Sequence, residues 1–550
     1  MRRFAECADA IAATSSKLEK VRILGEYLAS LDVDRLAVAT RFMAGRIFPA
    51  WDGRVLMVGW AAMRTVVLEL TGAGDTEMAA SYRRHADSGD VMRDLMEAAG
   101  HAAPGLDILE VAAGFDRIAA TTGSSRARTV QLTELLRACT PAEGRYVTKL
   151  ISGDMRIGLR EGLVEEAVAR AFDRPAAAVA RADMLMGDLG AVAVLAAGDR
   201  LAEAAPRLGA PLRYMLASPV ADAAEVVARM GEEVWVEDKY DGIRCQLHKG
   251  PERTALYSRD LREITGQFPE IVAAAAELDG DLVLDGELLG FRDGRVMPFF
   301  DLQTRLGRKS PSAAVLEAVP VVFTAWDLLH QGGEWLLDTP LRERRARLEA
   351  LRLGGRFAVA HLERATGAAE VDALFLDARA RLNEGLMAKN PDSSYTPGRR
   401  GLAWLKLKRP LDTLDCVVVG AEWGHGKRRG VLSDVTFAVR IAEGSDELAT
   451  VGKAYTGLTD AEIAEMTRLL LDSTVQDHGH HRSVRPEIVV EIAFDSVQPS
   501  TRHRSGYALR FPRIARWRHD KGPEDIDTLE RVRQIATALV ENREQRVDQA

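Results

Sequence analysis

The sequence contains few cysteines and no long apolar run, and each absence excludes a class of protein. Its four cysteines, among 550 residues, lie far apart, with neither the paired spacing of a zinc site nor the density of a disulfide framework. No apolar run approaches the roughly 18 residues that a membrane-spanning helix needs. The start, MRRFAECADAIAATSS, carries Glu6 and Asp9 where the apolar part of a signal peptide would lie. We therefore expect a cytoplasmic protein with no membrane partner.

A phosphate-binding loop is also missing, and so is a positive net charge. No Gly-x-x-x-x-Gly-Lys-Ser/Thr occurs, and GHGKRRG at 424–430 has the wrong spacing for a dinucleotide fingerprint. The net charge of −8 weakly disfavours a polyanionic partner. However, five Lys/Arg and no acid lie in 399–409, and seven Lys/Arg with one acid lie in 502–521. Basic tracts of this kind are suited to binding a polyanion.

The chain is too long for one compact core, and its pattern changes twice along its length. Residues 1–215 place apolar residues three and four apart, which predicts successive helices and no strand. Residues 216–410 alternate β-branched runs with helical pieces, which predicts an α/β or α+β domain. Residues 411–550 contain short strands between glycine turns, with one helical insert, and end in a helical pattern. Such a set of strands suits a small β-barrel of the oligonucleotide-binding kind, the OB-fold.

The stretch EDKYDGIR, at 237–244, raises the main question about chemistry. Asp241 and Gly242 predict a turn after a strand, and Lys239 beside this turn could be an ordinary surface charge. Lys239 could also be a nucleophile that attacks phosphorus. A lysine amine does so in its free-base form, which neighbouring cations or a dry pocket favour. The stretch alone is too short to decide between these two interpretations.

A lysine nucleophile of this kind needs carboxylates for a metal, cations for phosphates and an aromatic face for a base. LDGELL places Glu287 in the turn of a strand pair, and EGLMAKN places Glu384 at the start of a short strand. WLKLK alternates, so Lys406 and Lys408 should project from one face of a strand. Like charges side by side are costly unless an anion lies between them. Each piece alone also fits an ordinary turn or edge strand, but their joint occurrence favours the nucleophile.

Taken together, these motifs resemble those of a known family. EDKYDGIR, YSRD, LDGELL, EGLMAKN, WLKLK and YALRFPRIARWRHDK are similar to the successive nucleotidyltransferase motifs of ATP-dependent DNA ligases. LISGDMRIGLREGLVEEAVARAF and PLRYMLASP resemble pieces of the helical DNA-binding domain of the three-domain members. The resemblance covers nearly the whole chain, although the first hundred residues match loosely.

The resemblance implies a multidomain fold and an activity. The domains would be an all-α DNA-binding domain at 1–215, an α+β adenylation domain at 216–410, and an OB-fold domain with a C-terminal helix at 411–550. The enzyme would use ATP and Mg²⁺ to seal nicked double-stranded DNA, acting as a monomer. A covalent lysine-AMP intermediate would pass AMP to the 5′-phosphate, and the 3′-hydroxyl would then form the phosphodiester bond.

The resemblance also implies roles for residues that match the motifs. Lys239 would take AMP from ATP, Glu237 would lie beside the adenine, and Phe323 would stack on its ring. Arg244 and Arg259 would hold phosphate and ribose.

Further positions would act on the metal and the phosphates. Glu287 and Glu384 would hold a divalent metal near the α-phosphate. The remaining ATP contacts would be made by basic residues, the last two swinging in to orient pyrophosphate: Arg400, Lys406, Lys408, Arg518 and Lys521.

Contacts to DNA are expected where small residues lie beside arginine or lysine, because backbone N–H groups and side chains can then reach phosphates together. SSRAR at 124–128 and SGDMRIG at 152–158 have this composition, and GHGKRRG is expected to be a basic turn of the barrel that can contact a DNA backbone. Each could equally be an ordinary loop between elements. The candidate DNA-binding residues are Arg126, Arg128, Gly153, Arg156, Lys427 and Arg428.

Two other function classes stay open at this point. An RNA ligase or an mRNA capping enzyme shares the Lys-x-Asp-Gly core, but a capping enzyme is not expected to carry a helical domain like 1–215. A non-enzymatic DNA-binding scaffold could keep the fold, yet every expected catalytic position holds the residue type that the chemistry requires.

Overall fold

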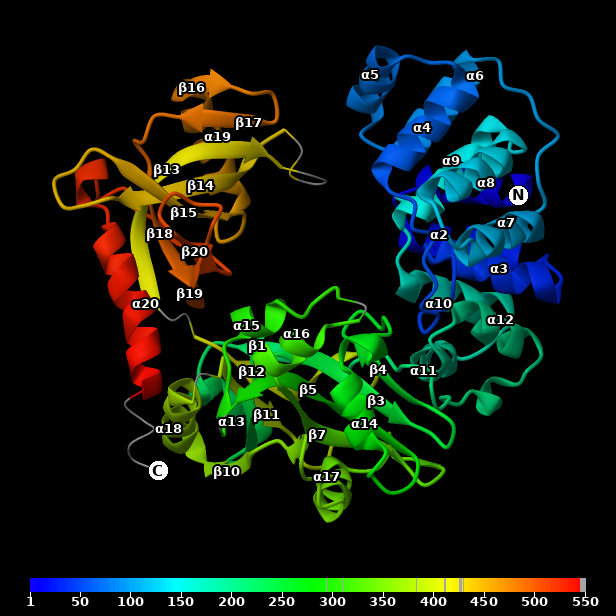
Figure 1. Cartoon of the computed structure of the whole chain (residues 1–550). Coiled ribbons are helices and arrows are strands. Elements are labelled where there is room, and N and C mark those ends of the chain that lie inside the picture. The colour runs from blue at the N-terminus through cyan, green and yellow to red at the C-terminus, as the bar shows by residue number, and fades with distance from the viewer. Residues whose placement is uncertain are drawn as a thin grey trace.

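The computed structural model of this chain describes residues 1–544 except 293, 309, 382, 410, 411, 425–427 and 429. It consists of a helical body, a body of two facing sheets and a strand-rich body, and the second lies between the other two (Figure 1). Described residues 1–215 contain no strand, and the first strand begins at Leu216. The predicted fold class is therefore confirmed. No helix among the described residues has the length and apolar character needed to cross a membrane.

The helical body begins its helices where the sequence offers a cap. Thr140 and Glu143 form a capping box, and Ser124 accepts a hydrogen bond from the Ala127 N–H. The helices are α1 (Arg2–Ala12), α2 (Lys17–Ala29), α3 (Val33–Met43), α4 (Trp60–Thr71), α5 (Asp75–His85), α6 (Ser88–Ala98), α7 (Ile108–Ala120), α8 (Ser125–Arg137), α9 (Pro141–Ser152), α10 (Glu161–Ala171), α11 (Ala176–Met186) and α12 (Leu189–Ala197), followed by a 3-10 turn at Leu201–Glu203.

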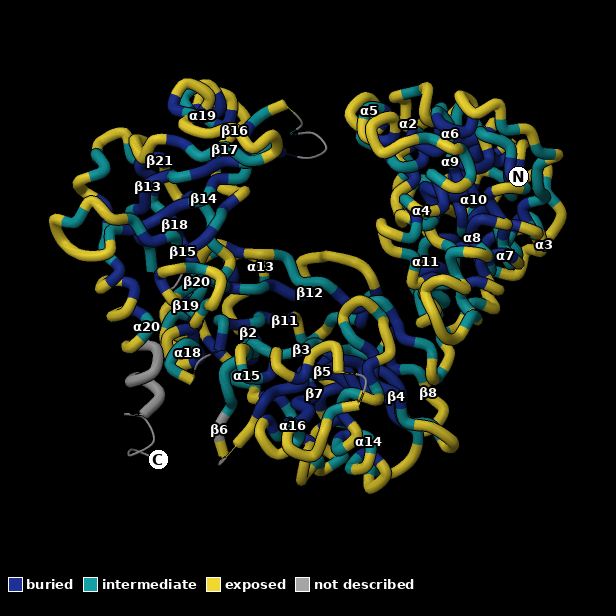
Figure 2. The backbone as a smooth tube through the Cα atoms, turned by 45° about the horizontal axis from the view of Figure 1, so that its top comes forward, coloured by how far each residue is buried: buried dark blue, intermediate teal, exposed yellow. Residues whose placement is uncertain are grey.

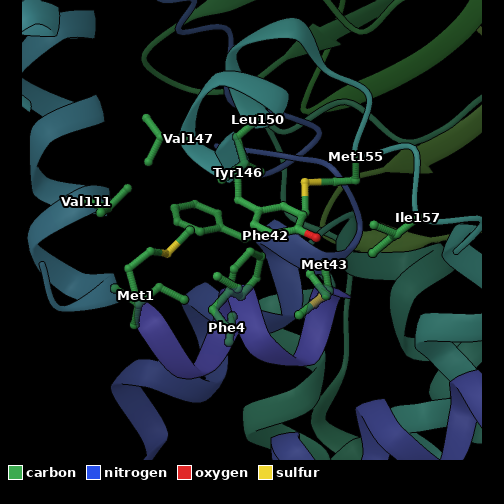
Figure 3. Packing of buried hydrophobic residues seen from close by; sticks show 14 of the residues in the cluster. Met1, Phe4, Phe42, Met43, Val111, Tyr146, Val147, Leu150, Met155 and Ile157 are labelled. Carbon is green, nitrogen blue, oxygen red and sulfur yellow. The ribbon is translucent and has the colours of Figure 1, made fainter. Parts of the chain in front are cut away.

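Aromatic side chains form the centre of the helical core. The Phe4 ring lies edge-to-face against Phe42 and Tyr146, at centroid distances of 6.2 and 6.1 Å. Figure 3 shows these rings directed toward one another from separate helices, with Met1 and Met155 beside them. Each edge-to-face pair contributes on the order of 1 kcal/mol beyond the burial of its area. This packing joins α1, α3 and α9, which lie far apart in sequence.

Two sheets face each other in the second body. One has the order β1-β12-β11-β2-β10, and the other has the order β4-β3-β5-β7-β8, with β6 beside β5 and β9 beside β7. The strands are β1 (Leu216–Val220), β2 (Glu233–Lys239), β3 (Ile243–Lys249), β4 (Thr254–Ser258), β5 (Leu282–Arg292), β6 (Arg295–Val296), β7 (Val321–Gln331), β8 (Glu334–Trp335), β9 (Phe357–Val359), β10 (Leu362–Thr366), β11 (Gly385–Lys389) and β12 (Arg400–Leu407).

Helices cover the outer faces of these two sheets. Val226 and Phe375, of the helices over the first sheet, lie in one apolar cluster, and Ile271 and Leu348, over the second sheet, lie in another. The helices are α13 (Ala223–Met230), α14 (Pro269–Ala275), α15 (Phe299–Gln303), α16 (Ala313–Ala318), α17 (Leu341–Ala350) and α18 (Gly367–Ala380), with a 3-10 turn at Thr265–Gln267. Figure 2 shows β5 and β7 as buried and α16 as mostly exposed.

The third body is built around one long strand, β13 (Asp412–Trp423), that pairs with several other strands along its length. Strand β13 pairs with β14, β17 and β18, and β18 pairs with β21. The other elements are β14 (Leu432–Arg440), β15 (Leu448–Ala454), α19 (Asp460–Asp472), β16 (Thr474–Asp477), β17 (His481–Val484), β18 (Val489–Phe494), the hairpin β19 (Ser496–Pro499) and β20 (Tyr507–Arg510), β21 (Arg513–Trp517), a 3-10 turn at Pro523–Asp525, and α20 (Leu529–Glu544). The helical insert expected among these strands is α19.

Candidate active site

Lys239 is the last residue of β2, and residues 240–242 form the turn into β3. The Lys239 Nζ contacts the Glu384 carboxylate, and the Glu384 backbone N–H donates to the Lys239 carbonyl at 2.8 Å. A Cβ at Gly242 would lie 2.5 Å from the Leu288 carbonyl oxygen and 2.7 Å from the Glu287 Cγ. Only glycine therefore lets this turn pack against β5, which brings Lys239 toward Glu287.

The expected position of Glu287 in a turn is wrong, because Glu287 lies within β5, paired with Arg244 of β3. The sequence Leu-Asp-Gly suggested a turn, but the glycine here allows close packing, since a Cβ at Gly286 would lie 2.7 Å from the Phe323 ring. Glu384 precedes β11, as expected. Both carboxylates thus approach Lys239 from different sheets.

The two carboxylates differ in their electrostatics. Burial, together with the charges of Glu384 and Asp241, raises the pKa of Glu287 to about 8, although Lys239 and Arg244 act against this shift. Burial alone would also raise the pKa of Glu384, but Lys239 and Lys408 outweigh burial and lower it. The Lys408 Nζ lies 2.5 Å from the Glu384 carboxylate. Glu384 is therefore held ionised by the lysines, whereas Glu287 is a site where added positive charge would be stabilising.

Several cations of this site have no acidic partner. Arg259, after β4, and Arg400 and Lys406, on β12, form no ion pair with any residue that the structure describes. Burial, followed by the positive charges of Lys408, Lys239, Arg400 and Arg259, lowers the pKa of Lys406. Such a group of like charges is unfavourable until an anion enters it. The arrangement is therefore suited to binding a polyanion beside Lys239.

Arg244 is held in a fixed position by contacts within the protein. Its guanidinium forms an ion pair with Asp285 at 2.7 Å and donates to the Met215 carbonyl at 3.0 Å. The Tyr395 hydroxyl also donates to Asp285, at 2.7 Å. The Arg244 guanidinium lies 4.6 Å from the centre of the Tyr214 ring. Arg244 therefore connects the segment before β1 to the second sheet.

Glu237 is fully enclosed between two cations. Its carboxylate lies 2.5 Å from the Lys389 Nζ and 3.2 Å from the Arg345 guanidinium. Burial raises the pKa of Glu237, and burial lowers the pKa of Lys389. The Lys389 Nζ also lies 4.4 Å from the Trp404 ring centre. Lys389 and Arg345 were not identified from the sequence, because nothing local to them shows that they meet Glu237.

Phe323 does not face this site, and the expectation that it stacks on a base is wrong. Phe323 pairs with Leu288 and is 0% exposed in the outer core of the second sheet. The neighbouring residue Thr324 pairs with Glu287, so in this part of β7, before its irregular pairing with β5, the even-numbered residues face inward. Trp326 is on that face, 5.4 Å from Arg244, and its buried indole N–H has no hydrogen-bond partner among the described residues. The alternation of β7 could have indicated Trp326.

The third body touches the Lys239 turn through β20. Arg510 forms an ion pair with Asp241, with Nη2 at 2.9 Å from Oδ1, and its guanidinium lies 4.7 Å from the Phe299 ring centre. A cavity of about 660 Å³ lies beside this contact, lined by Glu384 and by residues of α15, β19 and β20. The motif YALRFPRIARWRHDK, residues 507–521, thus contacts the site through its N-terminal part, which contains Arg510.

The C-terminal part of this motif, with Arg518 and Lys521, contacts the third domain itself instead of the site around Lys239. The Arg518 guanidinium and the Lys521 amine both contact Asp415 of β13, at 2.9 and 2.6 Å. Arg518 also pairs with Asp520 at 2.7 Å. In this conformation the structure does not bring Arg518 and Lys521 to Lys239.

The expected DNA-binding residues have different surroundings. Arg126 is exposed in the first turn of α8, whereas the Arg128 guanidinium donates to the Thr121 carbonyl at 3.2 Å. Gly153 caps α9 in a left-handed conformation, with φ of +73°. Arg156 pairs with Asp154 and Asp87 within its own domain.

The two remaining candidates lie at the 424–430 turn. Arg428 donates to the Tyr455 carbonyl at 2.5 Å. Lys427 lies outside the described residues.

Comparison with known protein families gives matches along most of the chain. Family models described as "DNA ligase N terminus", "ATP dependent DNA ligase domain" and "ATP dependent DNA ligase C terminal region" match residues 1–169, 214–408 and 428–521. A probable DNA ligase of Koribacter versatilis is 44% identical, over 100% of this chain and 98% of that protein. A DNA ligase of Methanothrix thermoacetophila is 36% identical, over 97% of each chain.

Two further similarities cover nearly the whole chain. A probable DNA ligase of Opitutus terrae is 44% identical over 98% of this chain, which spans 62% of that protein. The solved structure titled "Pmar-Lig_PreS3" has a TM-score of 0.59 and 18% identity, covering 94% of this chain and 99% of that one. At this identity the structural similarity supports the fold alone.

Proposed function

This chain belongs to the ATP-dependent DNA ligase family, and on that premise we propose that Lys239 is the nucleophile that takes AMP from ATP. Enzymes of this family form a covalent lysine-AMP intermediate, pass AMP to the 5′-phosphate at a nick, and join the nick with the 3′-hydroxyl. The observation that carries the residue assignment is the position of Lys239 beside Glu384 and a group of unpaired cations.

In the first step, the lone pair of the Lys239 Nζ attacks the α-phosphorus of ATP. The bond from this phosphorus to the bridging oxygen of the β-phosphate breaks, pyrophosphate leaves, and the nitrogen loses a proton. Arg259, Arg400 and Lys406 neutralise the phosphate oxygens, together with Lys408 once the anion is bound. Phosphoryl transfer is catalysed mainly by such positioning and charge neutralisation.

The adenosine would occupy the space between the two sheets. Glu237 would lie beside the adenine, held in place by Lys389 and Arg345. Trp326 replaces Phe323 as the aromatic face for the base, because it lies on the inner side of β7. Arg244 would contact the ribose or the phosphates from its fixed position on Asp285.

The residues present fit a divalent metal when ATP supplies the remaining ligands. No group of three or more metal-ligating side chains occurs among the described residues. Mg²⁺ is commonly bound by one or two carboxylates plus substrate phosphates and water. Glu287 and Glu384 provide such carboxylates, and because burial raises the pKa of Glu287, a bound cation would favour its ionised form. Mg²⁺ would supply charge neutralisation at the phosphates of ATP.

Arg518 and Lys521 would orient pyrophosphate only after a rotation of the third domain. That rotation would separate Arg510 from Asp241, and Arg518 and Lys521 would also have to release Asp415, which belongs to their own domain. The conformation with Arg510 on Asp241 would then serve the later steps, when DNA rather than pyrophosphate occupies the site. In those steps a 5′-phosphate oxygen attacks the lysine-bound AMP, Lys239 regains its proton, and the 3′-hydroxyl finally displaces AMP.

The helical domain would hold nicked duplex DNA opposite the catalytic site. Arg126 has an exposed guanidinium for this purpose, and Gly153, Arg128 and Arg156 would contribute through loop backbone or by leaving their present partners. The turn with Lys427 and Arg428 would contact the DNA backbone from the third domain. We further propose that the protein is a cytoplasmic monomer, which gel filtration of the free protein would test.

Labelling with α-labelled ATP tests the assignment of Lys239. Lys239→Ala should form no covalent AMP adduct, and Lys239→Arg should fail equally, since a guanidinium stays protonated at neutral pH. Lys249→Ala is the matched control, because Lys249 lies on β3, the next strand along the chain, and its amine donates to the Gly280 carbonyl at 2.8 Å. Robust labelling of either Lys239 variant would refute the assignment. A requirement for ribose at the 3′ side of the nick would indicate an RNA ligase instead.

A further inference from the structure

The segment that joins the helical domain to the adenylation domain is bound along its length. The Gly209 N–H donates to the His248 ring, and Leu212 exchanges two hydrogen bonds with the Gln246 side chain, at 3.0 and 2.8 Å. The Tyr214 hydroxyl donates to the Tyr257 carbonyl at 2.7 Å. Residues 209–214 are therefore fixed to the adenylation domain by these hydrogen bonds and do not form a flexible linker.

A cluster of charges fixes the helical domain to the end of this segment. The Arg213 guanidinium donates to both oxygens of Glu161 on α10, at 3.0 and 2.6 Å, and lies 3.1 Å from Asp183 on α11. The Arg399 guanidinium lies 3.3 Å from Glu165, one helical turn after Glu161. Arg213 and Arg399 enclose, with these acids, a small cavity of about 110 Å³ between the domains.

The two arginines of this junction lie close in sequence to residues that contact or form part of the candidate site. Arg399 precedes Arg400, one of the unpaired cations, and the Leu216 N–H donates to the Arg399 carbonyl at 2.9 Å. Two residues after Arg213, the Met215 carbonyl accepts from Arg244. A displacement of α10 would therefore act on β1 and β12, the parallel pair that carries these groups.

We infer that Glu161 and Glu165 are positioning residues for nick sealing, because they hold Arg213 and Arg399 and thereby fix the helical domain relative to Lys239. This inference rests on the proposed function. Ion pairs restrict geometry better than they stabilise, since much of their attraction is offset by lost hydration. DNA held by the helical domain would then present its nick at one defined place, which proximity-based catalysis requires.

A charge exchange across the junction provides the test. Glu165→Arg and Arg399→Glu each place like charges opposite one another, and the double variant restores an opposite pair with exchanged signs. Each single variant should lose on the order of tenfold in kcat/KM for nicked DNA, and the double variant should recover to within about threefold. Single-turnover labelling of Lys239 by ATP should stay within about twofold in all three, because neither residue is among the proposed nucleotide contacts.

Glu203→Arg and Arg200→Glu are the matched controls, since they reverse the same charges in an exposed pair inside the helical domain. They should leave nick sealing unchanged. This result would show that a loss of sealing in the junction variants comes from the broken contact between the domains and not from a change in the charge of the protein. Trypsin cleavage after the exposed Arg207 provides a second measurement, and it should accelerate in the single variants alone. The inference would be overturned if the single variants seal nicks as well as the parent. It would also be overturned if the kcat/KM of the double variant is as low as that of the single variants. Loss of Lys239 labelling in the unaltered protein would overturn the proposed function instead.

Discussion

Replacing Asp183 by asparagine should make the helical domain more stable at pH 8, although the change removes a charge that lies near Arg213. Asp183 is 1% exposed, and neither carboxylate oxygen accepts a hydrogen bond from a described residue. Arg213 keeps its two hydrogen bonds to Glu161 when Asp183 is neutral. The substitution therefore removes a poorly solvated charge without leaving its partner unpaired.

The magnitude follows from the titration of this carboxyl group. Burial raises the pKa of Asp183 from its ordinary value of 3.8 to about 7, despite the opposing charges of Arg213 and Arg46, with Glu161 and Glu165 adding to the shift. Between these values the folded chain binds more protons than the unfolded chain, so its stability falls as pH rises. At about 1.4 kcal/mol for each pH unit, ionisation costs at most about 4 kcal/mol by pH 8.

The assay is native-state hydrogen exchange of α10 and α11 amides in the full chain, with urea unfolding for comparison. The stability of Asp183→Asn should equal that of the parent near pH 4, exceed it increasingly up to about pH 7, and keep this advantage at pH 8. Asp188→Asn is the contrasting control, because Asp188 is buried but hydrogen-bonded to Arg41 and to the Gly190 N–H. That variant should lose about 1–3 kcal/mol. A stability difference for Asp183→Asn that does not change with pH would refute the reasoning.

Three further predictions concern the catalytic site. Trp326→Leu should raise the KM for ATP in Lys239 labelling about tenfold or more, whereas Phe323→Leu should lower stability by about 1 kcal/mol and leave this KM unchanged; the reverse pattern would restore Phe323 as the stacking residue. Lys406→Met should slow labelling by about 10²-fold, measured under single turnover, because a phosphate loses its counter-charge; an unaltered rate would remove Lys406 from the site. Substituting Arg518 and Lys521 together by alanine should abolish labelling by ATP yet leave partial sealing of a nick that already carries AMP, and equal loss of both activities would assign the pair to DNA binding or folding.

The order of elements could be read from the sequence because it depends on local periodicity. Helical spacing in 1–215 and alternation in the later strands each reflect which side chains must face a core within one element. The catalytic motifs were equally readable, since Lys239, Glu384 and Lys406 are each identified by residues adjacent to them. Glu287 was misplaced because Asp-Gly usually marks a turn, whereas here glycine permits close packing inside a strand.

The sequence by itself thus determined the helical, mixed and strand-rich segments, and it pointed to Lys239 and to the types of residue that surround it. Only the tertiary structure decided which residues of β7 face the first sheet, because a one-residue change of register would move Phe323 to the inner face and Trp326 to the outer face. The tertiary structure also formed the ion pairs of Glu237 with Lys389 and Arg345, and that of Asp241 with Arg510. In the same way it paired Glu161 and Glu165 with the arginines of the adenylation domain. These contacts join residues 52 to 269 positions apart, and no local preference of the chain encodes which distant charges will be brought within 4 Å.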